Sequence, residues 1–372
     1  MKNNFGTNIS LSIFGESHGE MIGCVLDGLP AGFEIDLDAL QRDMDKRRAK
    51  DDLSTRRQEP DRVSIVSGFF EGKTTGTALT ILIENTNTRS QDYAALKSRL
   101  RPGHAELSAF EKYHGFQDYR GGGHFSGRIT APLCAAGSIC RQILAKKGVL
   151  IGSHILQLHH LHDEPFSADL SVLQKQIASM NQKEFAVIDD QDAEAFQEEI
   201  RTASKKLDSV GGILQSAVTG LPSGIGEPFF DSVESVLSHL LFSIPAVKGV
   251  SFGDGFGFAS LYGHEANDPI EYNDGFRTLT NRNGGINGGI TNGMPLLIQT
   301  VIKPTPSIYL PQKSADYLSH ENVILEIKGR HDPAIIHRAR AVVDAAIAFG
   351  LLDLWMSREA TEAFAPASVT GR

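Results

Sequence analysis

The sequence has few cysteines and no pattern that would use them. Only three of its 372 residues are cysteine, at positions 24, 134 and 140, and all three lie in apolar surroundings. Their number is odd, and their spacing matches neither a metal site nor a disulfide framework. Isolated thiols of this kind are typical of a reducing compartment, so the sequence predicts a cytoplasmic protein. A chain of this length buries roughly three quarters of its unfolded surface and needs no covalent staple.

The chain also lacks an excess of basic residues and any long apolar run. Its 36 Lys and Arg residues are outnumbered by 45 Asp and Glu residues, which gives a net charge of -9. Nucleic-acid-binding domains usually carry a basic surface and a basic isoelectric point. No run approaches the length of a membrane span, and the first residues lack the apolar core of a signal peptide. The composition therefore predicts neither a nucleic-acid partner nor a membrane partner, and an anionic ligand must be bound by local groups.

A third absence concerns the fold class. No G-x-G-x-x-G fingerprint opens a helix after the first apolar strand, as a dinucleotide-binding unit would require. Helices are expected after the N-cap Asp36, from Pro132 to Lys147, near Asp231, and from Asp332-Pro333 onward, where Asp332 is expected to cap the helix. Strands follow one another without regular helical crossovers, which indicates an α+β fold with antiparallel sheets. The expected strands are 21–27, 62–70, 77–84, 149–155, 212–219, 247–252 and 294–302.

The expected domain organisation is simple. Residues 1–357 are predicted to form one catalytic domain, within which the polar segment 156–203 forms a peripheral helical lobe. Residues 358–372 are predicted to be a flexible tail.

The most distinctive short motif is Gly15-Glu16-Ser17-His18-Gly19. It matches G-x-S-x-G, the nucleophile elbow of α/β-hydrolases, in which the serine stands on a strand-to-helix turn. Only about a dozen residues precede the motif, and an apolar strand, not a helix, follows it. We therefore expect a β-hairpin turn here. Taken alone, the same residues are also compatible with an ordinary solvated turn.

Four further patches combine glycine with charged or polar residues. Glycine leaves backbone N–H groups accessible and lets the main chain approach a planar or phosphorylated ligand. A fifth segment, Lys303-Pro304-Thr305-Pro306-Ser307, offers a cation and two hydroxyls to a phosphate group, although it is also compatible with an ordinary strand exit. The glycine patches are Arg101-Pro102-Gly103-His104, Arg120 to Arg128, Gly284 to Gly293, and Gly329 to Pro333.

A histidine-rich segment, His159-His160-Leu161-His162-Asp163-Glu164, could suggest a metal site. It shows neither the i, i+4 helical pair nor the second ligand cluster of a closed site. We therefore expect a solvated loop there and no metal in the active site.

Together and in this order, the patches resemble the signatures of the chorismate synthase family, from about Gly6 to about Leu354. The resemblance implies a single-domain β-α-β sandwich, with two antiparallel sheets flanked by helices, in a homotetramer. It implies a lyase that converts 5-enolpyruvylshikimate 3-phosphate to chorismate and phosphate by 1,4-elimination, the last common step of the shikimate pathway to aromatic amino acids. The cofactor is reduced FMN. Whether NADPH or an outside reductant reduces it stays open.

The resemblance also implies roles for individual residues. His104 would donate a proton to the leaving phosphate, His18 would donate one to the reduced flavin, and Asp332 would act through a flavin nitrogen. Ser17 and Ser126 would orient these groups. Four arginines would bind the substrate's phosphate and carboxylates: Arg47, Arg101, Arg128 and Arg330. The flavin would contact His124, Phe125, Ser126, Gly288, Lys303, Pro304, Thr305, Pro306, Ser307 and Arg330.

The chain departs from the family pattern at His124-Phe125-Ser126, where many members carry Arg-Ser-Ser. Histidine replaces a permanent charge with one that titrates near neutrality. Two other hypotheses stay open at this point. An acyl hydrolase built on Ser17 would react with a fluorophosphonate and need no flavin, and a non-catalytic binding protein would bind reduced FMN yet release no phosphate.

Overall fold

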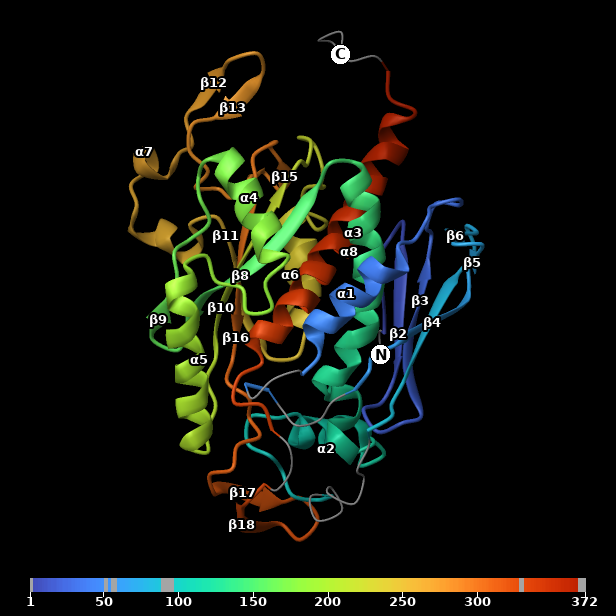
Figure 1. Cartoon of the computed structure of the whole chain (residues 1–372), viewed down its shortest axis with the longest axis vertical. Coiled ribbons are helices and arrows are strands. Elements are labelled where there is room, and N and C mark those ends of the chain that lie inside the picture. Colours follow the sequence, from blue (N-terminus) through green and yellow to red (C-terminus); the bar gives the residue numbers. More distant parts are fainter. Residues whose placement is uncertain (1–2, 50–52, 55–58, 88–96, 328–330, 367–372) are drawn as a thin grey trace.

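The computed structural model describes residues 3–49, 53–54, 59–87, 97–327 and 331–366 (Figure 1). Its longer strands are β2 (Ser10–Gly15), β3 (Met21–Asp27), β4 (Val63–Ser67), β7 (Leu79–Glu84), β8 (Leu150–Leu158), β10 (Gly212–Thr219), β11 (Val247–Phe252), β16 (Leu296–Ile302), β17 (Gln312–Asp316) and β18 (Glu321–Leu325). The short strands are β1 (Asn4–Phe5), β5 (Phe69–Phe70), β6 (Lys73–Thr74), β9 (Leu161–His162), β12 (Ile270–Tyr272), β13 (Phe276–Thr278), β14 (Ile286–Asn287) and β15 (Ile290–Thr291). The α-helices are α1 (Leu37–Arg47), α2 (Glu106–Tyr113), α3 (Thr130–Lys146), α4 (Leu170–Met180), α5 (Asp190–Lys205), α6 (Val233–Ser243), α7 (Gly263–Ala266) and α8 (Ile336–Glu362).

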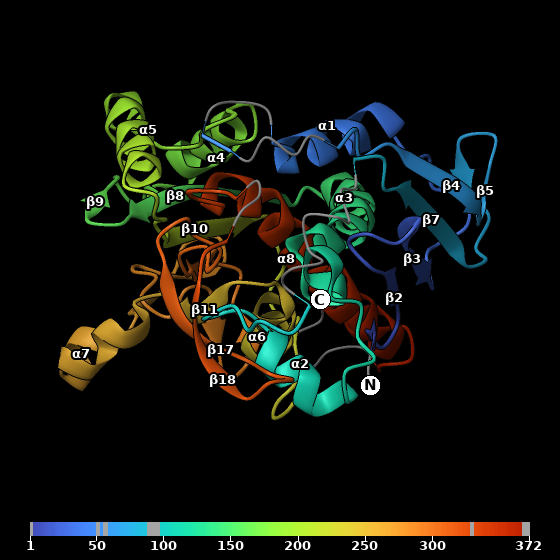
Figure 2. The ribbon, with the colours of Figure 1, turned by 90° about the horizontal axis from the view of Figure 1, so that it is seen from below.

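The chain forms two five-stranded sheets. A layer of helices lies between them (Figure 2). The first sheet has the strand order β1-β2-β3-β7-β4 and the second has the order β11-β16-β10-β8-β9. Every neighbouring pair in both sheets is antiparallel. The prediction of an α+β fold with antiparallel sheets and helices between and around them is therefore confirmed. The expected strand 62–70 is divided at Gly68, whose φ of +72° makes a turn between β4 and β5.

Helices α3 and α8 form the centre of this layer. A Cβ atom on Gly137 of α3 would lie 2.5 Å from Ala345 Cα of α8, so the two backbones approach too closely for any larger residue. The start of α3 near Pro132 and its end before Gly148 agree with the sequence prediction, as does the N-cap of α1, where Asp36 accepts a hydrogen bond from Ala39 N–H at 2.8 Å. No helix in the described ranges is long and apolar enough to cross a membrane.

Both ends of α8 differ from expectation. The predicted N-cap role of Asp332 is wrong: the helix begins at Ile336, and the cap residue Ile335 contributes no side-chain cap bond. The carboxylate of Asp332 instead pairs with Arg338, with Oδ2 and Nη2 2.6 Å apart. At the other end the helix continues to Glu362, so the boundary predicted at residue 358 falls inside it. An ion pair between Arg358 and Glu362 joins successive turns there.

The segment 156–203 is more closely integrated than a peripheral lobe. It contains the last residues of β8, the strand β9 and the helices α4 and α5. Helix α4 lies against β8 of the second sheet, and the buried residues of α5 belong to the main core. The apolar face of α4 packs into a small core of its own with Ala217 of β10. A buried chain of hydrogen bonds joins His154 of β8 to Asp163 at 2.8 Å and to Gln215 of β10 at 2.9 Å. This network attaches the polar segment to the sheet.

Candidate active site

The motif at residues 15–19 forms the turn between β2 and β3, so the hairpin prediction is confirmed. The nucleophile elbow is excluded because a strand follows the serine, and β2 pairs directly with β3 in antiparallel register. Ser17 is 0% exposed and His18 is 7% exposed, so the alternative of a solvated turn is wrong. The backbone N–H of Ser17 donates to the carbonyl of Gly123 at 3.1 Å. A second loop therefore covers the motif.

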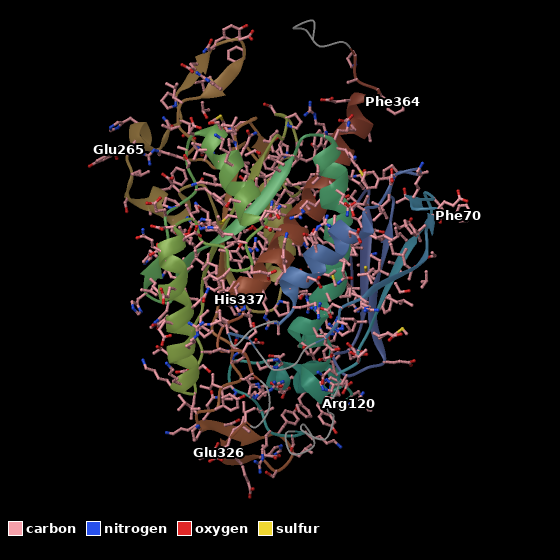
Figure 3. The ribbon with its side chains drawn as sticks, viewed as in Figure 1. Phe70, Arg120, Glu265, Glu326, His337 and Phe364 are labelled. Carbon is pink, nitrogen blue, oxygen red and sulfur yellow. The ribbon has the colours of Figure 1, made fainter. Side chains whose placement is uncertain are left out.

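That second loop is the glycine run that follows Arg120, beside α2 at the lower end of the molecule (Figure 3). Gly121, Gly122 and Gly123 all have positive φ, at +60°, +82° and +53°, a conformation that favours glycine. A Cβ on Gly121 would lie 2.1 Å from both Cε1 and Nδ1 of His18. A Cβ on Gly122 would lie 3.1 Å from Cε1 of His104. Two consecutive glycines thus place the backbone against the two histidines that the sequence predicted as proton donors.

His104 forms a mostly buried cluster of hydrogen-bonded side chains with Arg101 and Glu106. Oε2 of Glu106 lies 2.9 Å from Nδ1 of His104, and Oε1 accepts a hydrogen bond from Arg101 Nε at 2.6 Å and another from Nη2. Burial raises the pKa of the Glu106 carboxyl, but the hydrogen bond from His104 and the charge of Arg101 outweigh it, so the pKa lies below its usual value. Glu106 was missed in the sequence. The signal for it was a carboxylate two residues after the histidine, at the start of an amphipathic helix.

The segment Lys303 to Ser307 lies against this cluster, as predicted. Nζ of Lys303 donates to the carbonyl of Gly103, and Nη1 of Arg101 donates to Oγ of Ser307 at 3.2 Å. Strand β16 delivers these residues, because Lys303 follows its last residue directly. A Cβ on Gly103 would lie 3.3 Å from Cβ of Pro306, so the two loops are in close contact.

Residues 207–210 form a loop that the sequence analysis did not single out, and this loop holds the segment 303–309 in place. Ser209 Oγ donates to the carbonyl of Thr305 at 2.7 Å, and the N–H of Tyr309 donates to the carbonyl of Leu207 at 3.0 Å. The N–H of Val210 donates to the carbonyl of Pro333 at 2.8 Å. Residues 207–210 therefore hold the 303–309 segment and the start of the 331–335 segment together.

His331 and Asp332, which precede helix α8, also lie at the site. The ring of His331 lies 5.2 Å from that of Tyr309. Burial, followed by the charge of Arg101, lowers the pKa of His331 to about 4, against an opposing effect of Asp332, so the ring is neutral at pH 7. The solvent-facing alternative for His331 is therefore wrong. Arg330, predicted to bind both substrate and flavin, lies outside the described residues.

Arg47 and Arg128 are arranged differently from the prediction. Both guanidinium groups donate to the carboxylate of Asp61, which is 1% exposed: Arg47 Nη1 at 2.6 Å to Oδ2, and Arg128 Nη1 to Oδ1. Burial raises the pKa of Asp61, but the charges of Arg47 and then Arg128 lower it further, so the carboxyl is ionised. The rest of Arg47 is bound to Thr130 Oγ1 at 3.2 Å and to backbone carbonyls.

These two arginines therefore form a buried structural triad with Asp61. Arg128 also donates to Asn85 Oδ1 at 2.9 Å, and Asn85 in turn donates to the carbonyls of Glu16 and Gly19 at 3.1 and 2.8 Å. The triad thus supports the turn that carries Ser17 and His18. Binding of substrate by either arginine would require an exchange of these bonds, and it stays a prediction.

The segment His124-Phe125-Ser126, whose first two residues depart from the family pattern, makes three separate contacts. Nδ1 of His124 lies 2.9 Å from the carbonyl oxygen of Gly15, which fixes the ring against the opening motif. The ring of Phe125 lies 6.0 Å from that of Tyr113 in α2. Oγ of Ser126 accepts a hydrogen bond from Arg128 N–H at 3.2 Å and so caps the short turn before α3.

Gly288 lies far from the other predicted flavin contacts of the same chain. It lies in the tight turn between β14 and β15, before the start of β16, whereas Lys303 follows the end of β16. Seven residues of extended strand span about 23 Å at roughly 3.3 Å per residue. Figure 1 shows β15 near the top of the molecule and α2 and β17 near the bottom. The sequence pattern could not reveal this, because glycine turns look alike at either end of a strand.

The histidine-rich segment forms the tight turn between β8 and β9. His159 and His160 are exposed there, and Glu199 of α5 joins them, so that three ligand atoms lie within 4.8 Å of one another. Glu199 is a partner from outside the segment that the sequence did not reveal. The prediction of an active site without a metal stays untested.

Comparison with known proteins agrees with the resemblance. A sequence model of the chorismate synthase family matches residues 9–356. The chain is 40% identical over 359 residues to the chorismate synthase of Thermococcus kodakarensis, covering 96% of this chain and 98% of that protein. It is 41% identical over 356 residues to the chorismate synthase of Dehalococcoides mccartyi, covering 95% and 96%.

The chain belongs to the chorismate synthase family. It is thus an enzyme of the lyase class, in the pathway to aromatic amino acids. A solved structure titled as a chorismate synthase superposes with a TM-score of 0.75 at 24% identity, covering 95% of this chain and 93% of the other. This similarity confirms the fold.

Proposed function

We propose that this member of the chorismate synthase family eliminates phosphate from 5-enolpyruvylshikimate 3-phosphate to give chorismate, with reduced FMN as cofactor. One observation carries the proposal. The glycine run places His18 and His104, which lie 86 positions apart, against its neighbouring residues Gly121 and Gly122, next to a cluster of cations. Two potential proton donors beside a stretch of backbone without side chains suit a reaction that involves a planar cofactor and an anionic leaving group.

The cations beside His104 support an anionic substrate in a chain whose net charge is -9. Arg101 uses Nε and Nη2 for Glu106 and Nη1 for Ser307, and a guanidinium has five N–H groups, so it keeps donors for a ligand. Lys303 lies near Arg101, because its Nζ donates to the carbonyl of Gly103 in the same turn. Each charge-assisted hydrogen bond to a phosphate or carboxylate contributes roughly 1.5 to 3 kcal/mol.

Polar groups without partners support the binding of the flavin. In the part of the chain that the structure describes, Thr305 Oγ1 and His331 Nε2 are buried and have no hydrogen-bond partner. A buried polar group of this kind costs about 1 to 3 kcal/mol unless a ligand satisfies it. Backbone atoms of Gly121 to Gly123 offer a surface without side chains. When bound, reduced FMN supplies the electron-rich partner that this elimination needs, without net redox change.

The chain's own residues then have distinct tasks. His104 gives a proton to the departing phosphate oxygen, and Arg101 and Lys303 stabilise the charge that develops there. His18, buried beneath Gly121, provides a proton on the cofactor side. The carboxylate of Asp332 is oriented by its ion pair with Arg338, and we assign to it the final acceptance of the proton.

The decisive experiment is anaerobic incubation of the purified protein with reduced FMN and 5-enolpyruvylshikimate 3-phosphate, with release of phosphate and chorismate measured together. We expect both products in equal amounts, and none with oxidised FMN. Flavin-independent product formation would overturn the proposal. Binding of reduced FMN without product would favour a non-catalytic flavin protein. The hydrolase alternative predicts that a fluorophosphonate labels Ser17, which is fully buried.

We further propose that the enzyme acts in the cytoplasm as a homotetramer. Apolar side chains that project from the segment 255–279 support assembly, since isolated chains seldom expose so many. These residues include Phe256, Tyr262, Ile270, Tyr272 and Phe276, all more than 60% exposed. Light scattering coupled to gel filtration tests this proposal, and a mass of one chain, 40.4 kDa, would contradict it.

A further inference from the structure

The family resemblance assigns roles to His104 and Arg101 but none to their neighbour Glu106. It is the first residue of α2, and its carboxylate lies between Arg101 and His104. The side chains of these three residues are only 8%, 17% and 14% exposed, in the order Arg101, His104, Glu106. A carboxylate that contacts both a candidate proton donor and a candidate phosphate-binding cation can control both.

Local structure explains why the three groups meet. Gly103 has a φ of +73°, and the N–H of His104 donates to the carbonyl of Arg101 at 3.2 Å, so residues 101–104 form a tight turn. This turn brings the side chains of Arg101 and His104 back over the beginning of α2. The N-cap Ala105 provides no side-chain cap, and a carboxylate in the first helical turn is stabilised by the helix dipole.

The contacts decide which ring nitrogen carries the proton. An ionised carboxylate only accepts hydrogen bonds, and the low pKa of Glu106 keeps it ionised at neutral pH. Oε2 of Glu106 is 2.9 Å from Nδ1 of His104, whereas Nη2 of Arg101 is 3.2 Å away and already donates to Oε1. The shorter contact requires hydrogen on Nδ1. Nε2 is then the ring atom that remains for chemistry, and it lies beside Gly122, whose Cβ position is 3.3 Å away.

The charges that face His104 come from several elements. Arg101 lies on the same turn, Lys303 approaches through Gly103 from the segment after β16, and His331 lies near Arg101 and is neutral at pH 7. The carboxylate of Glu106 thus faces the imidazole together with two cations of opposite charge. Loss of the carboxylate would therefore leave the two cations beside the imidazole without a negative charge to oppose them.

We infer that Glu106 is a positioning residue for His104. It holds the ring so that Nδ1 carries the hydrogen and Nε2 points toward the reacting groups, and it also fixes Arg101 in place toward Ser307. The effect of Glu106 on kcat rests on the proposed function, whereas the position of the hydrogen on the imidazole of His104 does not. The arrangement is that of a histidine oriented by a buried acid, in which the acid is required for rate although it never touches the reacting atoms.

The test compares Glu106→Gln with Glu106→Asp and with Glu111→Gln, a control on the same helix whose carboxylate accepts from Tyr317 at 3.0 Å at the surface. We expect Glu106→Gln to lower kcat about 100-fold or more, with a small change in KM, because tautomer and orientation are lost. The alkaline limb of its kcat profile should move to lower pH, because a negative charge beside two cations is removed. Glu106→Asp should recover at least a tenth of the rate, and Glu111→Gln should match the wild type.

A second measurement uses the wild-type protein without substrate. Nitrogen-15 NMR of the imidazoles, with His104 assigned by comparison with a His104→Asn variant, should show its proton on Nδ1 at high pH and a changed tautomer balance in Glu106→Gln. A neutral imidazole at high pH with its hydrogen on Nε2 in the wild type would overturn the inference. So would an unchanged pH profile in a folded Glu106→Gln variant. If the wild type releases no phosphate, the proposed function fails, while the NMR result still decides the role of Glu106.

Discussion

Replacement of Gly121 with alanine separates catalysis from folding. The new Cβ would lie 2.1 Å from Cε1 and Nδ1 of His18 and 2.9 Å from Oγ of Ser17. Ordinary contacts between such atoms are about 3.5 to 4 Å, so the imidazole must move by about 1.5 Å or the glycine run must shift by the same amount. Either movement changes the position of His18 relative to His104.

The expected magnitudes differ for the two properties. Alanine at a φ of +60° costs roughly 1 to 2 kcal/mol, a small part of the roughly 5 to 15 kcal/mol that usually stabilises a folded protein. A catalytic group displaced by about 1 Å typically loses about 100-fold in rate. We therefore expect kcat to fall at least about 100-fold while cooperative unfolding is retained with a slightly lower Tm.

The assay is anaerobic phosphate release, together with thermal unfolding of the same samples. Gly127→Ala is the matched control, because it lies in the same loop, has no positive φ, and its Cβ would meet nothing within 4 Å. It should keep the wild-type rate and Tm. Gly121→Ala with more than a third of the wild-type kcat, or with no cooperative unfolding, would refute the reasoning.

Three other predictions follow from buried groups. Asp61→Ala leaves the guanidinium groups of Arg47 and Arg128 buried without their carboxylate and should lower the free energy of unfolding by about 3 to 5 kcal/mol in urea titrations; an unchanged midpoint would show that the triad is not structural. Burial, followed by the charges of neighbouring arginines, lowers the pKa of His337 to about 3, so this histidine contributes stability that is present above pH 6.5 and is lost as the pH falls toward 3. Between pH 7.5 and 5.5 the wild type should thus lose about 1.4 kcal/mol more than His337→Gln, and equal losses would contradict the assignment. The three cysteine thiols are buried, and burial raises their pKa values, to about 12 for Cys24, so they should react with a disulfide reagent only in denaturant; rapid reaction of the native protein would disprove their burial.

Much of the local structure could be predicted because its causes are local. Strands β10 and β11 begin and end where their apolar runs do, and Asp36 and Gly148 mark helix ends through short-range hydrogen bonds and φ preferences. The ordered set of glycine-rich patches was specific enough to identify the family. Within the active site, the meeting of the opening motif with residues 101–104 and 303–307 was expected from that resemblance.

The errors have a common physical origin in contacts between distant residues. Asp332 was expected to cap the helix because it stands before Pro333, but its carboxylate pairs with Arg338 in the first turn of α8. Nothing near Asp61 in sequence indicates Arg128, which lies 67 positions away, and nothing near Gly15 indicates His124, 109 positions away. Local propensity describes short-range preferences, whereas these partners are chosen by how sheets and helices pack.

The sequence by itself determined the class of fold, the main strands and helices, and the residue types that the chemistry needs, since periodicity, caps and glycine turns act over a few residues. Only the tertiary structure decided which of those residues meet. It buried Ser17 and His18 beneath Gly121, gave His104 its carboxylate, paired two predicted substrate arginines with Asp61, and placed Gly288 at the far end of β16. The physical reason is that close packing of the sheets and helices, which no short stretch of sequence encodes, fixes these distances.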